Sequence, residues 1–124
     1  MKKILIIDDE LAVATIFETA LKHEGYEVRV ATDGKSGIEV AKSDTFDLVL
    51  LDQMLPDMSG NDVLKQLKAE EATKNTLVAM LTNFGEDNLI KDAINIGAVE
   101  YILKYQVSVE DLVNKTKTLI GNSA

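Results

Sequence analysis

The chain has 124 residues, 46% of them hydrophobic and 27% charged, which suits one globular domain with a substantial core. Its net charge of −8, from 13 basic and 21 acidic residues, argues against a nucleic-acid partner, because such partners require a basic surface. The sequence has no apolar run long enough to cross a membrane, no signal-peptide pattern and no cysteine, so disulfides and thiolate metal sites are excluded and a cytoplasmic location is expected.

The first half of the chain alternates between strand and helix patterns. Residues 4–7 are four aliphatic residues in a row, which predicts a strand buried on both faces. Apolar residues then recur at helical spacing over residues 13–21. Residues 26–30 alternate apolar and polar side chains, a pattern that predicts an edge strand with one face in water. A short helix is predicted around residues 38–41.

The second half continues the alternation. Residues 47–52 and 77–81 predict two more strands buried on both faces, and residues 99–103 predict a second edge strand because they carry a charge. Ser108 and Asp111 have the spacing of a capping box at the start of the last helix. The predicted helices of this half lie over residues 63–67, 89–94 and 108–120.

The alternation of five strands with five helices predicts an α/β fold with a parallel sheet and helices on both faces. Right-handed crossovers leave few topologies for such a chain. Placing the two strands with polar positions at the edges favours the strand order 2-1-3-4-5, that of a doubly wound (βα)5 flavodoxin-like three-layer sandwich. Ligands of such sheets bind beyond the carboxyl ends of the strands, so the residues that follow each strand are the candidates for a site.

Polar residues follow four of the predicted strands. The first strand runs into Asp8 and Asp9, the third ends at Asp52, the fourth at Thr82 and the fifth at Lys104. Strands 1 and 3 are neighbours in the predicted order, so their three carboxylates are expected to converge. The hydroxyl and the ammonium group would flank them on the other side.

Each of these residues also has an ordinary structural explanation. Asp8 or Asp9 suits the N-cap of the first helix, and Thr82 suits that of the fourth. Asp52 suits a loop, and Lys104 suits a solvated strand end. None of these explanations accounts for the convergence. Carboxylates about 4 Å apart repel by about 4 kcal/mol at an effective dielectric near 20, so a cluster of three takes up a proton or a cation.

Oxygen ligands without His or Cys suit a hard cation, and a site with a few carboxylates suits Mg²⁺. A carboxylate is already ionised at neutral pH, so Asp52 needs no general base to attack a phosphoryl group. The product of that attack is an aspartyl phosphate.

The pattern resembles the receiver domain of bacterial two-component response regulators, of the single-domain chemotaxis-regulator type. The resemblance covers essentially the whole chain and predicts one receiver domain over residues 1–124. Thr82 lies 30 residues beyond Asp52 and Lys104 a further 22, spacings similar to those of the family. The residues that carry the resemblance are Asp8-Asp9, Asp52, Leu55-Pro56 with Gly60, Thr82, and Gly97-Ala98 leading to Tyr101 and Lys104.

The resemblance implies that Asp52 is the phosphoacceptor in a reaction that depends on Mg²⁺, with Mn²⁺ able to replace it. Asp9 and Asp52 would bind the metal directly, Asp8 through water, and Met54 through its backbone carbonyl. The phosphodonor would be a sensor histidine kinase or a phosphotransfer protein. The chain would catalyse its own phosphorylation and dephosphorylation without turning over a separate substrate.

The resemblance also implies how a signal leaves the site. Lys104 would pair with Asp52 and then with the phosphoryl oxygens, and Thr82 would bond the phosphoryl group. Movement of Thr82 would free space for Tyr101 to turn inward. The face made by the fourth helix, the fifth strand and the fifth helix would then change its affinity for a downstream protein. The protein would be a monomer or a phosphorylation-dependent dimer. It would contact neither nucleic acid nor membrane.

Some positions depart from the family pattern. Tyr105 stands where the family usually has proline, so the Lys104–Tyr105 peptide is predicted to be trans. Tyr105 suits either an anchor for a partner or an aromatic side chain packed at the rim of the site. Met54, Asn83 and Phe84 border the site, which predicts a dry pocket and slow hydrolysis of the phosphoryl bond.

Three other interpretations are compatible with parts of the sequence. A phosphatase of the haloacid dehalogenase type would need a second Asp two residues after Asp52, where the chain has Met54. A flavodoxin-like cofactor binder would need a phosphate-binding loop where Asp8 and Asp9 stand. A receiver that no longer accepts phosphate would lack a required residue, and none is missing here.

Overall fold

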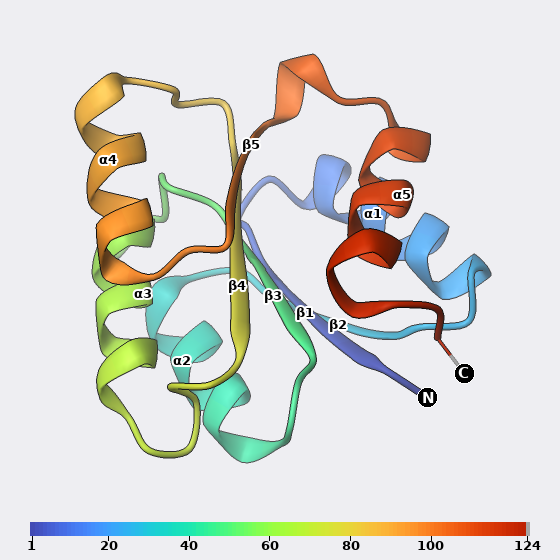
Figure 1. The fold of residues 1–124 in the computed structure, drawn as a ribbon, viewed down its shortest axis with the longest axis horizontal. Coiled ribbons are helices and arrows are strands. Elements are labelled where there is room, and N and C mark those ends of the chain that lie inside the picture. Colours follow the sequence, from blue (N-terminus) through green and yellow to red (C-terminus); the bar gives the residue numbers. More distant parts are fainter. Residues whose placement is uncertain (124) are drawn as a thin grey trace.

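The computed structural model describes residues 1–123 and contains a sheet of five parallel strands covered by helices on both faces (Figure 1). The strands lie in the order β2-β1-β3-β4-β5, so the predicted doubly wound fold is confirmed, with the two partly polar strands at the edges. The strands are β1 (Lys3–Ile7), β2 (Glu27–Ala31), β3 (Leu48–Leu51), β4 (Leu77–Thr82) and β5 (Glu100–Leu103).

Two helices cover one face of the sheet and three cover the other. Figure 1 shows α1 and α5 together on one side, and α2, α3 and α4 on the opposite side. No helix within residues 1–123 is both long and apolar enough to be a membrane span. The helices are α1 (Leu11–His23), α2 (Gly34–Ser43), α3 (Gly60–Ala69), α4 (Asp87–Ile96) and α5 (Val109–Ile120), with a short 3₁₀ helix, η1 (Lys104–Gln106), after β5.

Strand β1 supplies side chains to both layers of the core, because successive residues of a strand point to opposite faces. Leu5 and Ile7 pack among residues of α2, α3 and α4, whereas Ile4 and Ile6 pack among residues of α1 and α5. All four are almost completely buried, and each contributes about 2 kcal/mol relative to an exposed side chain. A register slip of one residue would exchange the two faces, so the end of β1 is fixed tightly.

The pairing of β1 with β3 decides which candidate site residues meet. Ile7 lies opposite Leu51, and the backbone N–H of Asp52 donates to the Ile7 carbonyl at 2.9 Å. Asp8 and Asp52, the next residue of each strand, therefore leave the sheet side by side.

Two local predictions are also confirmed. The Ser108 side chain accepts a hydrogen bond from the Asp111 backbone N–H at 3.0 Å, and the Asp111 carboxylate accepts one from the Ser108 N–H at 3.0 Å, which completes the capping box of α5. The Lys104–Tyr105 peptide is trans, since residues 1–123 contain no cis peptide bond.

Candidate functional site

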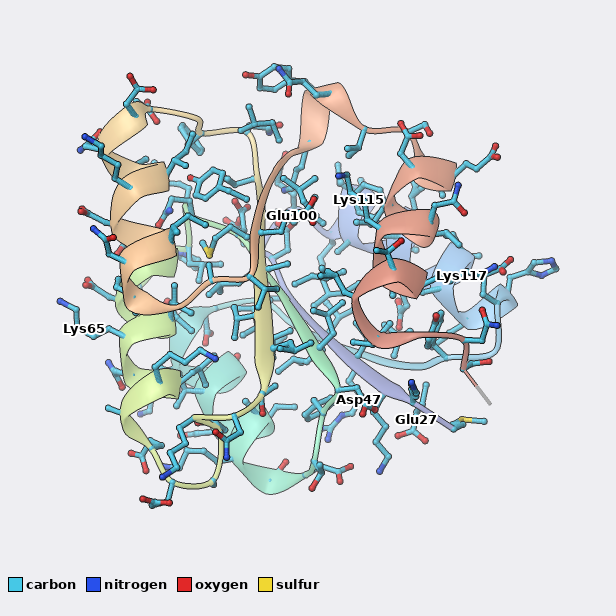
Figure 2. The ribbon with its side chains drawn as sticks, in the orientation of Figure 1. Glu27, Asp47, Lys65, Glu100, Lys115 and Lys117 are labelled. Carbon is cyan, nitrogen blue, oxygen red and sulfur yellow. The ribbon has the colours of Figure 1, made fainter. Side chains whose placement is uncertain are left out.

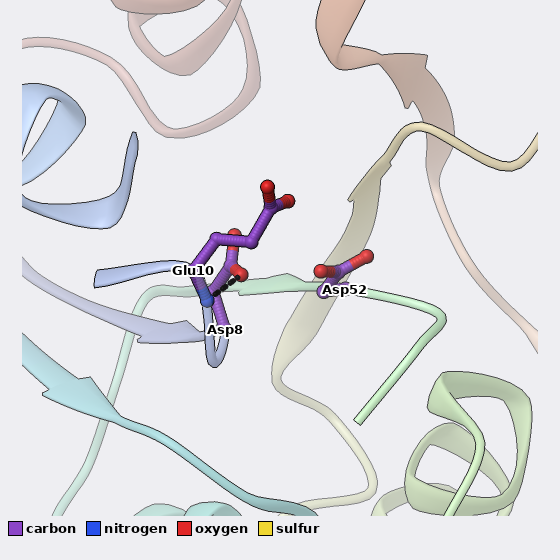
Figure 3. Close-up of side chains that lie close together, drawn as sticks. All are labelled: Asp8, Glu10 and Asp52. Carbon is purple, nitrogen blue, oxygen red and sulfur yellow. Dashed lines mark hydrogen bonds between the residues drawn. The ribbon is translucent and has the colours of Figure 1, made fainter. Parts of the chain in front are cut away.

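The carboxylates that follow β1 and β3 converge at the carboxyl edge of the sheet (Figure 3). Asp8 and Asp52 are only 1% and 3% exposed. The Lys104 ammonium lies between them, with Nζ 2.7 Å from Asp8 Oδ2 and 3.3 Å from Asp52 Oδ2. The structure therefore brings together two predicted acids and the predicted lysine, which come from three different strand ends.

Glu10 is a third acid of this cluster, although the pattern of polar residues at the strand ends does not indicate it. One oxygen each of Asp8, Glu10 and Asp52 lies within 4.8 Å of the others. Glu10 Oε1 is 2.8 Å from Lys104 Nζ. Its backbone N–H donates to Asp8 Oδ1 at 2.9 Å, which holds the turn into α1 and aims the Glu10 side chain back over the site (Figure 3). Only its position directly after the Asp pair could have indicated it.

Asp9 lies outside this three-carboxylate cluster. It is exposed, and it lines a pocket beside the buried carboxylates instead.

Met54, 58% exposed, and Phe84, half-buried, border the same pocket, as the sequence predicted. Tyr105 is 67% exposed and so is not packed against the rim. The residues that line this pocket are Asp9, Glu10, Asp52, Met54, Asn83 and Phe84.

Burial of the cluster changes how its groups bind protons. Burial raises the pKa of Asp8 to about 6, even though the contacts with Lys104 and the Glu10 N–H favour its ionised form. Burial alone would lower the pKa of Lys104, but its hydrogen bonds with Asp8 and Glu10 and the charge of Asp52 outweigh that effect and raise it. Lys104 is therefore a permanent cation that only partly offsets three acids.

The donor set suits a hard divalent cation. It consists of carboxylate oxygens, without sulfur or imidazole, and its negative charge exceeds the charge of Lys104. Burial makes the ionised form of Asp8 unfavourable and so raises its pKa, and binding of either a proton or a metal ion relieves this unfavourable charge. The cluster of Asp8, Glu10 and Asp52 can thus bind Mg²⁺.

Thr82 and Tyr101 lie on the β4–β5 side of the site. Thr82 is the last residue of β4 and is fully buried, and its Oγ1 accepts a hydrogen bond from the Phe84 N–H at 3.3 Å. It lies opposite Leu103 in β5, so Lys104 follows one residue beyond it. The Tyr101 hydroxyl donates to the Phe84 carbonyl at 2.6 Å, which links Tyr101 to the loop that follows Thr82.

Fold and site together define a class: a doubly wound α/β protein with an acidic pocket, whose oxygen ligands suit a cation, at the point where its strand order reverses. Within that class, the chain belongs to the response regulator receiver domain family, whose model matches residues 4–117. Receiver domains of this family act in two-component phosphorelay signalling. The sequence-based identification is thus confirmed.

Similar proteins support the assignment. The chain is 36% identical over 121 residues to the response regulator ArlR of Staphylococcus saprophyticus, covering 97% of this chain and 53% of that protein. It is 30% identical to sporulation initiation phosphotransferase F of Bacillus subtilis, covering 98% of each chain. Its structure resembles that of a CheY-like receiver domain protein from Methanospirillum hungatei JF-1, with a TM-score of 0.89 and 32% identity over 95% of this chain and 92% of that one. The chain spans about half the length of several curated relatives that it matches.

Proposed function

We propose that the receiver domain over residues 1–124 accepts a phosphoryl group on Asp52 from a phosphohistidine of a sensor histidine kinase or a phosphotransfer protein. The observation that carries this proposal is the convergence of buried Asp8 and Asp52 around the Lys104 ammonium. Burying ionised carboxylates is unfavourable, as the raised pKa of Asp8 shows. A module that only binds a partner would have no need to keep two such carboxylates buried.

Asp52 is the nucleophile of the proposed transfer. One of its oxygens forms a bond to phosphorus while the bond from phosphorus to the histidine nitrogen breaks, and the imidazole leaves with the bonding electrons. Charge develops on the oxygens of the transferred group. The Lys104 ammonium, 3.3 Å from Asp52 Oδ2, and the Thr82 hydroxyl at the neighbouring strand end are placed to offset it.

Mg²⁺ is the proposed cofactor, and Mn²⁺ can replace it. Asp9, Asp52 and the Met54 backbone carbonyl are the proposed direct ligands, with Asp8 binding through water. Glu10 adds a further carboxylate whose oxygen lies within 4.8 Å of those of Asp8 and Asp52. When bound, the divalent ion supplies positive charge next to the phosphoryl group. The oxygen-only donor set and its excess negative charge support this part of the proposal.

The face formed by α4, β5 and α5 is the proposed output surface toward a downstream protein. Tyr101 of β5 is the proposed switch, since its hydroxyl contacts the loop that follows Thr82. Glu100 of β5 pairs with Lys115 of α5 at 2.7 Å, which ties two elements of this face together (Figure 2). Assembly as a monomer or as a phosphorylation-dependent dimer is compatible with this role.

The proposed activity is confined to the chain's own phosphorylation and dephosphorylation, without turnover of a separate substrate. The net charge of −8 supports a protein partner over a nucleic acid. A cytoplasmic location belongs to the proposal, because a phosphohistidine donor made from ATP has to share the compartment.

Intact mass spectrometry tests the assignment of Asp52. Wild type, Asp52→Ala and Asp92→Ala are incubated with acetyl phosphate and Mg²⁺, and one phosphoryl group should add to the first and third only. Asp92 is an exposed aspartate of α4 and serves as the matched control. A chelator in place of Mg²⁺ should abolish the uptake.

Two outcomes would contradict the proposal. Equal uptake by wild type and Asp52→Ala would assign the phosphoryl group to another residue. No uptake by the wild type, with both acetyl phosphate and a phosphohistidine donor, would identify a receiver that no longer accepts phosphate.

A further inference from the structure

Gln53, the residue after Asp52, is a buried polar side chain without a role in the chemistry proposed above. It is 5% exposed. Its Oε1 accepts a hydrogen bond from the Asn61 backbone N–H at 2.8 Å, and its Nε2 donates to Asn61 Oδ1 at 2.9 Å and to the Tyr101 hydroxyl at 3.2 Å. A buried amide with this many partners fixes the groups around it.

The directions of these hydrogen bonds follow from one another. The Asn61 backbone N–H only donates, so Gln53 Oε1 is the acceptor and Nε2 the donor. The Tyr101 hydroxyl accepts from Nε2 and therefore donates its own hydrogen, to the Phe84 carbonyl at 2.6 Å. Asn61 Oδ1 accepts, so its Nδ2 donates, and it reaches the Leu89 carbonyl of α4 at 3.2 Å. The network thus has a single consistent set of donors and acceptors.

The backbone of Gln53 joins this network to the proposed phosphoacceptor. Its N–H donates to Asp52 Oδ1 at 2.7 Å, and its carbonyl accepts from the Gly60 N–H at 2.8 Å. A Cβ at Gly60 would lie 2.2 Å from the Asp52 carbonyl oxygen, so the start of α3 packs directly against this segment. A change at the Asp52 carboxylate therefore reaches the Gln53 backbone N–H through one direct hydrogen bond, and the side chain of the same residue contacts Tyr101.

We propose that Gln53 is a positioning residue that holds the Tyr101 ring against the core and couples it to the Asp52 carboxylate. The coupling part rests on the proposed function, in which Asp52 receives the phosphoryl group. Through Tyr101 the network contacts β5, and through Asn61 it contacts Leu89 of α4, so one side chain reaches two of the three elements of the output face. Tyr101 itself is half-buried against the core cluster that includes Ala98 and Met80.

Fluorine NMR of protein labelled with 3-fluorotyrosine tests this proposal. The chain has three tyrosines, and Tyr101→Phe assigns the Tyr101 signal. Gln53→Met keeps the length of the side chain and removes its hydrogen bonds, and Gln66→Met makes the same change at an exposed position of α3 as the matched control. Asn61→Ala disturbs the network without altering residue 53, and it serves if Gln53→Met does not fold.

Before any phosphodonor is added, Gln53→Met should move the Tyr101 signal toward that of the exposed Tyr105. The ratio of inward to outward ring should fall about fivefold, the factor expected from one net hydrogen bond. Gln66→Met should leave the signal unchanged. After acetyl phosphate and Mg²⁺ are added, Gln53→Met should still gain one phosphoryl group by mass, with a smaller change in the Tyr101 signal than the wild type shows.

A Tyr101 signal that is identical in wild type, Gln53→Met and Asn61→Ala, before and after phosphorylation, would overturn the proposal. A wild-type protein that gains no phosphoryl group would overturn the coupling to Asp52 together with the proposed function. The first comparison, made without phosphodonor, would still decide whether Gln53 positions Tyr101.

Discussion

Replacing Asp8 with asparagine should stabilise the metal-free protein at neutral and alkaline pH. The Asp8 carboxyl is 1% exposed, and burial raises its pKa from 3.8 to about 6. The folded chain then holds this proton more tightly than the unfolded chain does. The free energy of unfolding therefore falls as the pH rises through the interval between these two values, and the full cost is present above pH 6.

The pKa difference sets the size of the effect. At 1.36 kcal/mol per pH unit, a rise from 3.8 to about 6 corresponds to about 3 kcal/mol. Asparagine avoids this cost but also loses the ion pair with Lys104, whose Nζ is 2.7 Å from Asp8 Oδ2. Because the pKa of about 6 already includes this contact, we expect Asp8→Asn to be more stable than wild type by about 3 kcal/mol at pH 8, with the difference falling toward zero as the pH falls below 4.

Urea denaturation followed by far-ultraviolet circular dichroism measures this difference, with a chelator present to remove divalent ions. Asp92→Asn, which removes an exposed aspartate of α4, is the matched control and should match wild type within about 0.5 kcal/mol. Saturating Mg²⁺ should then stabilise wild type, by about 2.7 kcal/mol at a hundred times its dissociation constant, and Asp8→Asn by less. An Asp8→Asn protein less stable than wild type at pH 8, or a stability difference independent of pH, would refute the reasoning.

Four further substitutions test other parts of the site. Lys104→Met removes the ammonium that contacts three carboxylates, so the free energy of unfolding of the metal-free protein should fall by about 3 kcal/mol at pH 8 and by less at pH 5. Equal losses at both pH values in urea denaturation would contradict this. Met54→Ala and Phe84→Ala open the pocket beside Asp52 and should each speed the loss of the phosphoryl group, followed by intact mass; unchanged rates would show that neither side chain shields it. Gly60→Ala places a methyl group 2.2 Å from the Asp52 carbonyl oxygen and should lower stability by about 1–3 kcal/mol in thermal denaturation, so a wild-type melting temperature would mean that the start of α3 shifts freely.

The sequence was sufficient to predict the fold and the convergence of Asp8, Asp52 and Lys104, because both follow from one rule. Apolar strands of a parallel sheet end at the same edge, and the burial of β1 and β3 fixes their register. Glu10 was missed because its approach to the site depends on the turn between β1 and α1, where its N–H bonds Asp8 Oδ1. A strand-end pattern contains no information about such a turn.

The Gln53 network was missed for a different reason. Gln53, Asn61 and Tyr101 are separated by 8 and 40 residues along the chain, and no periodic pattern relates them. Their contact depends on the close packing at Gly60 and on rotamers set by the surrounding core. Each residue taken alone suits an ordinary loop, helix or strand position.

The position of each group in the sheet suits the part that we assign to it. Asp8 and Asp52 follow β1 and β3, which have a neighbouring strand on each side and whose side chains, apart from that of Lys3, are buried, so the acids are held rigidly where charge must be offset. Tyr101 lies in β5, an edge strand with a single neighbour and only partial burial, where a ring can move without opening the core. Gln53 lies where the two regions meet, bonded to Asp52 through its backbone and to Tyr101 through its side chain. In the proposed function, a signal that begins as charge at the buried centre of the sheet can therefore end as movement of the Tyr101 ring at its less buried edge.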